Sequence, residues 1–134
     1  MKDDQINFRI LLRSPKYPAI VIAEDDIWPA FDIEELGTVC VISESEDGST
    51  NMKVIDNTGE EFSYLPNHYA LTPGFPAKKW TKKKIIDLYN SSEASKESNI
   101  EYSPKSLSSK RLSEIITEIC DILSHNQRLH ENPS

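Results

Sequence analysis

The strongest constraint on the fold is a series of short apolar segments between residues 5 and 75, separated by residues that favour turns. Most of these segments alternate apolar and polar side chains, and one is apolar on both sides, as β-strands are. The predicted strands are residues 6–13, 19–23, 38–43, 51–56 and 61–65. Short strands joined by tight turns predict a small, strongly bent antiparallel β-barrel or half-barrel of the SH3-like kind.

Turn-forming sequences divide the predicted strands. Residues 46–50 contain Asp-Gly and residues 56–61 contain Asn-Thr-Gly, and both favour reversal of the chain. Gly59 can adopt a positive φ there without steric cost. The segment between the second and third predicted strands is an insertion with one helical turn over residues 31–36. Residues 66–79 hold three prolines and are predicted to cross the molecule irregularly.

The C-terminal third of the chain predicts helices. Residues 81–90 predict a short helix with Thr81 as its N-cap and with apolar side chains on one side. Residues 91–106 contain six serines and few apolar groups, which is typical of a flexible linker. Residues 109–127 carry apolar side chains at helical spacing and predict an amphipathic helix.

The sequence therefore predicts an α+β chain made of three parts. The expected parts are a β-barrel domain over 1–90 that includes the helix 81–90, a linker over 91–106, and an amphipathic helix over 107–130. The last helix could pack on its own barrel or join a second copy into a homodimer, and the sequence does not distinguish the two.

Composition and charge argue against several classes of function. The formal net charge is −7, and an acidic chain is a poor candidate for non-specific binding of nucleic acid or of an anionic membrane. The N-terminal residues are charged rather than apolar, unlike a signal peptide, and the apolar runs are too short to cross a bilayer. We expect a cytoplasmic protein with no membrane partner.

The cysteines are expected to have a structural role rather than a catalytic or redox role. Cys40 and Cys120 lie far apart in the chain, and neither belongs to a CxxC motif. Two buried, reduced thiols are the expected state, with an intramolecular disulfide as the alternative. A nucleophilic pair of either cysteine with His68 would require a coincidence of folding.

No sequence motif indicates an enzyme. The chain lacks a GxSxG elbow, a P-loop, an HExxH motif and a dinucleotide glycine fingerprint. His68, His125 and His130 are scattered, so no zinc site is predicted, and the acidic stretches lack the spacing and glycine of a calcium loop. We expect a non-catalytic protein with no metal and no cofactor.

Acidic residues are concentrated in one block. Residues 24–61 contain twelve acidic side chains and a single base, Lys53. If the loop at 24–35 and the turns at 46–49 and 56–61 share one end of the barrel, their carboxylates form a single negative patch. Such a patch would steer a basic partner toward the protein, although ordinary solvated loops are the simpler interpretation.

The stretch AEDDIWPAFDIEEL, residues 23–36, gives the candidate docking residues. Aromatic side chains ringed by charge are typical of interface hot spots, whereas the simpler interpretation is that Trp28 and Phe31 cover the core. The candidate partner-binding residues are Asp25, Asp26, Trp28, Phe31, Asp32, Glu34 and Glu35.

Lysines form the opposite concentration. Lys82, Lys83 and Lys84 occupy the first turn of the predicted helix 81–90, where the helix dipole disfavours cations. Such an unfavourable arrangement suggests either that the lysines have a function or that an acidic group lies near them in the fold. A nucleic-acid module using these lysines with Lys78, Lys79 and Trp80 is a third hypothesis, and the net charge argues against it.

Part of the chain resembles a known group of proteins. DNTGEEFSYLPNHYALTPGF followed by KKWTKKKIIDLYN is similar to small single-domain bacterial proteins of undefined activity, some of them in toxin–immunity neighbourhoods. The resemblance covers roughly residues 5–92 and identifies no functional residue.

These observations favour a non-catalytic binding protein. The first hypothesis is a bacterial immunity protein whose acidic patch neutralises a basic toxin domain, one that attacks nucleic acid for example. The alternative is an SH3-like adaptor that binds a peptide or a larger complex through its aromatic residues.

Overall fold

The computed structural model describes residues 8–23, 26–43, 52–65, 69–74, 76–100, 102 and 109–131. It has an α+β fold around a six-stranded mixed sheet with the order β1-β6-β5-β4-β2-β3. The strands are β1 (Arg9–Ile10), β2 (Ala19–Ala23), β3 (Asp26–Ala30), β4 (Met52–Ile55), β5 (Glu61–Leu65) and β6 (Ala70–Pro73). The helices are α1 (Ile33–Ser43), α2 (Lys82–Asn90), α3 (Glu93–Ser98) and α5 (Leu112–Glu131). Neighbouring strands are antiparallel except for the parallel pair β1 and β6.

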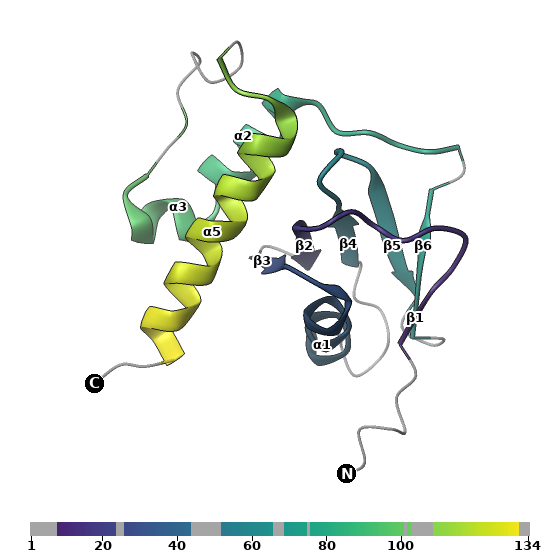
Figure 1. Cartoon of the computed structure of the whole chain (residues 1–134). Helices are drawn as coiled ribbons and strands as arrows, with labels where there is room; N and C mark the ends of the chain where they lie inside the picture. Colours follow the sequence, from purple (N-terminus) through teal and green to yellow (C-terminus); the bar gives the residue numbers. More distant parts are fainter. Residues whose placement is uncertain are drawn as a thin grey trace.

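Both faces of the sheet are covered by helices at its β2 end (Figure 1). Because successive side chains of a strand point to opposite faces, Val21 packs with Leu36 of α1 while Ile20 packs on the other side. That second core contains Tyr89 of α2 and Ile119 of α5. The prediction that residues 19–23 form a strand buried on both faces is thus confirmed.

The described strands form an open sheet with β1 and β3 at its edges, and closure into a barrel of the SH3-like kind is not confirmed. One cause is that residues 38–43, predicted as the third strand, are the second half of α1. The β-branched residues there favour a strand, but Leu36, Val39 and Cys40 recur at helical spacing and pack together on the sheet. Burial of this face therefore overrides the local strand propensity.

Two strands lie where the sequence predicted none. β3 falls inside the predicted insertion, and its Pro29 is tolerated because β3 is an edge strand. β6 falls inside the predicted irregular crossing and pairs with β5, for example Tyr64 with Leu71. In both segments the run of alternating apolar and polar residues is too short to predict a strand.

The C-terminal helices pack against the sheet of the same chain. α2 matches the prediction, and the Thr81 hydroxyl accepts the Lys84 N–H at 3.2 Å. The structure differs from the linker prediction for 91–106, because residues 93–98 form α3, which is capped by the buried Ser92. α5 begins three residues after the predicted helix 109–127 begins and ends four residues after it ends. It contributes Ile115 and Ile119 to the core on its own sheet. No helix in the described part of the chain has the apolar length needed to cross a membrane.

The turn between β4 and β5 connects the sheet to α5. Gly59 has a φ of +89°, as the sequence predicted, and a Cβ atom added there would lie 2.6 Å from Cδ2 of Leu112. The Asn57 side-chain amide donates to Oγ1 of Thr117 at 3.1 Å. The other predicted turn, at 46–50, lies outside the described residues.

Substitution Gly59→Ala should lower the free energy of unfolding by about 1 kcal/mol or more, because a side chain disfavours the positive φ and collides with Leu112. Urea unfolding measures the loss. Gly74→Ala is the matched control, since no positive φ constrains Gly74 and an added Cβ would meet Pro76 O at 3.2 Å. Equal losses in the two variants would contradict the assigned role of Gly59.

Candidate functional site

The junction between β3 and α1, residues 30–35, holds most of the exposed residues of the predicted docking stretch. The chain leaves the buried Ala30, bends at Phe31 and Asp32, and enters α1. Oδ1 of Asp32 accepts the Glu35 N–H at 2.8 Å, and Oε1 of Glu35 accepts the Phe31 N–H at 2.8 Å. This reciprocal capping satisfies free N–H groups at the helix start and fixes the direction in which the chain enters the helix.

Apolar and acidic side chains alternate on the surface of this junction. Phe31 is 36% exposed and Ile33 is 48% exposed. The carboxylates of Asp32, Glu34 and Glu35 are exposed beside them. Negative charge is also favoured locally because the positive end of the α1 dipole lies here. The junction thus presents apolar contact area within a negative rim, on a backbone held by its own hydrogen bonds.

The other predicted docking residues do not join this group. Asp26 is exposed but pairs with Ala23 at the start of β3, and the strand separates it from Asp32 by roughly 13 Å or more. Trp28 is half-buried and packs against the core beneath α1, which is the position that the simpler interpretation expected. Asp25 lies outside the described residues. Ile33, which was not among the predicted docking residues, is exposed between Asp32 and Glu34 and lies two residues after Phe31.

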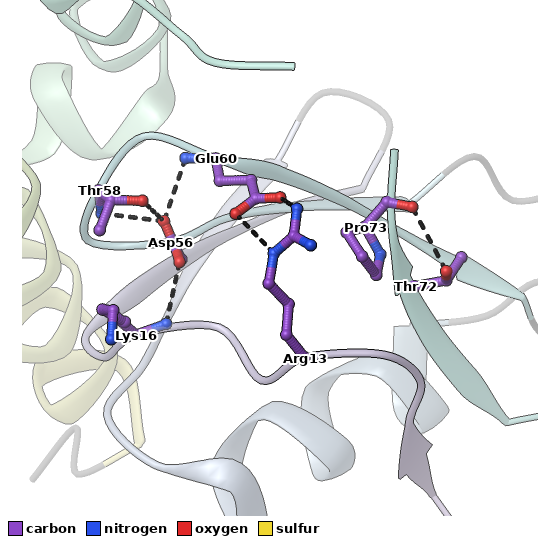
Figure 2. Close-up of polar contacts among 7 residues, drawn as sticks. All are labelled: Arg13, Lys16, Asp56, Thr58, Glu60, Thr72 and Pro73. Carbon is purple, nitrogen blue, oxygen red and sulfur yellow. Dashed lines mark hydrogen bonds and ion pairs between the residues drawn. The ribbon is translucent and has the colours of Figure 1, made fainter. Parts of the chain in front are cut away.

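Asp56 organises the β4–β5 turn instead of joining an acidic surface. It is 2% exposed, and its Oδ1 accepts hydrogen bonds from the Thr58 N–H, the Thr58 hydroxyl and the Glu60 N–H. Its Oδ2 accepts the Lys16 N–H at 3.0 Å (Figure 2). The carboxylate therefore serves as the internal anchor of the turn and of the segment that leads into β2.

Glu60 and Glu61 are buried beside Asp56 and are also paired. Glu60 forms an ion pair with Arg13, drawn in Figure 2. Glu61 accepts the Trp80 indole N–H at 2.8 Å with one oxygen and pairs with Lys53 at 3.2 Å with the other. The prediction that the turn at 56–61 adds to one exposed negative patch is wrong, because its carboxylates face internal donors.

The pKa of Glu61 reflects this environment. Burial raises it, but the hydrogen bonds from Trp80 and Lys53 outweigh burial and hold the pKa below the ordinary value of 4.5. A carboxylate with a lowered pKa stabilises the folded state above its unfolded pKa, and that contribution is lost as the pH falls through the folded value.

Substitution Glu61→Gln should therefore flatten the dependence of stability on pH between about pH 5 and pH 3. Urea unfolding midpoints across this range measure the effect. Glu34→Gln is the control, because it removes an exposed carboxylate that bonds to no described side chain. An unchanged pH dependence in the Glu61→Gln variant would show that the Trp80 and Lys53 contacts do not favour the ionised form.

The cysteines are free and buried, as expected. Cys40 lies in the core beneath α1 and Cys120 in the core beneath α5, so the sheet separates them and they form no disulfide. Burial raises the pKa of each thiol to about 12. Both are therefore protonated at neutral pH. His68, the other member of the conceivable nucleophilic pair, lies outside the described residues.

The described residues contain no group of three or more His, Cys, Asp or Glu side chains that could hold a metal ion. No protein-family model, curated protein or solved structure matches the chain. The resemblance to proteins of toxin–immunity neighbourhoods accordingly stays a prediction from the sequence.

Proposed function

We propose that the protein is a non-catalytic binding protein that neutralises a basic toxin domain, as bacterial immunity proteins do, and that the β3–α1 junction contacts the toxin. The observation that carries this proposal is the run of exposed residues 31–35, in which Phe31 and Ile33 alternate with three carboxylates. A toxin that attacks nucleic acid needs a cationic cleft to hold phosphate, and this surface has the complementary charge.

The two kinds of side chain contribute differently to such an interaction. The carboxylates of Asp32, Glu34 and Glu35 attract a cationic cleft over a distance and raise the association rate, an effect that falls with salt. Phe31 and Ile33 lose apolar surface to the partner only after contact, so they slow dissociation. The proposal therefore predicts separable effects of charge and of apolar surface.

The capping hydrogen bonds support the proposal through preorganisation. Phe31 is held by its N–H bond to Glu35, and α1 is fixed on the sheet through Leu36 and Cys40. Because the junction need not be ordered on binding, little conformational entropy is lost. A rapidly formed, tight complex is what a stoichiometric inhibitor requires.

The SH3-like adaptor remains the second proposal. It is favoured by apolar residues exposed near the β1 edge of the sheet, where Leu11 is 39% exposed and Leu12 is 86% exposed. An adaptor that docks there would bind through apolar contact and would tolerate salt. Binding at the junction would be sensitive to salt, so the two proposals can be separated.

Charge at the junction can be removed without removing the caps. In the variant Asp32→Asn, Glu34→Gln, Glu35→Gln, the amide oxygens can still accept the capping N–H groups. We expect its association rate with a captured basic partner to fall about tenfold or more at low salt. Stopped-flow or surface-based kinetics measure this rate.

The matched control is Asp87→Asn, Glu93→Gln, Asp121→Asn, which removes three exposed carboxylates from the other helices. Its association rate should stay within about twofold of the original, because only local charge steers docking. An equal fall of the association rate in both variants would show that the rate depends on net charge and not on the junction. An unchanged association rate in the junction variant would show that the acidic residues are ordinary solvated surface, and it would favour the adaptor.

A further inference from the structure

The end of the molecule at the β4–β5 turn is surrounded by cations, although the turn itself is acidic in sequence. Figure 1 shows this turn together with the starts of α2 and α5 at one end of the molecule. Its carboxylates are buried, and they are either ion-paired (Glu60 and Glu61) or hydrogen-bonded to N–H and O–H groups (Asp56), so they expose little negative surface. What remains exposed around the turn comes from three separate segments of the chain.

Backbone contacts bring these segments together. The Asn57 N–H donates to the Lys16 carbonyl at 2.8 Å, and the Glu61 N–H donates to the Lys78 carbonyl at 2.9 Å. Lys79 pairs with Glu60 as an isolated bridge. On the α5 side, Arg111 directly precedes the residue whose side chain covers Gly59.

A lysine also links the starts of the two helices. The Lys82 ammonium at the start of α2 donates to the carbonyl of Lys110 at 3.1 Å, just before α5 begins. Both helix N-termini, with their partial positive charge, therefore lie beside the same cluster of cations. We define the cationic end as Lys16, Lys78, Lys79 and Arg111 with these two helix starts.

The four side chains of the cationic end are exposed, and none forms an ion pair with a carboxylate among the described residues. The acidic side chains nearest to it are engaged. Glu114 accepts the Arg111 N–H at 2.8 Å, and Glu118 accepts Lys110 at 2.8 Å and the Tyr102 hydroxyl at 2.9 Å. The local surface charge is thus positive in a chain whose net charge is −7.

We propose that the cationic end binds the phosphate backbone of nucleic acid. Three of its four cations are lysines, compact charges on flexible stems that suit a line of phosphates better than bidentate pairing with carboxylates. Helix N-termini favour phosphate in the same way. This proposal is independent of docking at the β3–α1 junction. It replaces the expectation, drawn from net charge alone, that the acidic chain binds nucleic acid poorly. Net charge is a poor guide here because charges more than about 10 Å away are screened at moderate salt.

The geometry indicates contacts with the backbone rather than with bases. Trp80, the aromatic residue beside the cationic end, has Lys84 placed 4.1 Å from its ring centre, and its indole N–H is bound to Glu61. It is half-buried and is not a free platform for stacking a base. We therefore expect weak sequence preference and a strong dependence on salt.

Fluorescence anisotropy with a labelled single strand and a labelled duplex, each of about 20 nucleotides or base pairs, tests the proposal at about 50 mM salt. We expect binding whose affinity falls steeply as salt rises. In the variant Lys78→Gln, Lys79→Gln the affinity should fall about tenfold, and the slope of log K against log salt should decrease by about 1.5.

Arg9→Gln, Lys96→Gln is the matched control, because it removes two exposed cations from β1 and α3. It should retain both affinity and slope, and thermal unfolding should confirm that both variants are folded. Equal losses in the two variants, or no binding by the unmodified protein, would overturn the proposal. Binding of poly-glutamate in preference to both nucleic acids would overturn it in favour of an acidic protein partner.

Discussion

The structure depends on burying β2 from both sides. Ala19, Ile20 and Val21 have no exposed surface, and consecutive residues of a strand face opposite sides of the sheet. One layer of helices cannot cover such a strand, so α1 lies on one face and α2 with α5 on the other. α5 accordingly packs on the sheet of its own chain. Because the helices cover β2 on both faces, the β3–α1 junction and the cationic end lie at the edges of these helical layers.

Much of the fold could be predicted because some segments are unambiguous. The alternation in β4 and β5 and the capped helix α2 were predicted close to their observed bounds. α1 was missed because its β-branched residues favour a strand locally, and only the burial of Leu36 and Cys40 on the sheet decides for a helix. α3 was missed because its serines resemble a linker in composition. Ser92 and Ser95 are in fact buried and bonded to the backbone around them.

The candidate site could be predicted only in part. Residues that are close in the sequence stay close in the structure. The group of Phe31, Asp32, Glu34 and Glu35 was therefore identified correctly and lies together. A strand length separates Asp26 from them, which a count of charges along the chain cannot show. The same count assigned the β4–β5 turn to the acidic surface. Folding turns its carboxylates inward against Arg13, Trp80 and Lys53, and it gathers cations from distant segments around them.

Hydrogen–deuterium exchange of the chain, free and bound to the basic partner that it captures, tests the central claim most directly, namely that the β3–α1 junction is the contact surface. We expect slower exchange on binding in residues 31–36, with the cationic end unchanged. Protection confined to the β1 edge around Leu11 and Leu12, with the junction unaffected, would contradict the claim and would support an adaptor that binds through apolar contact.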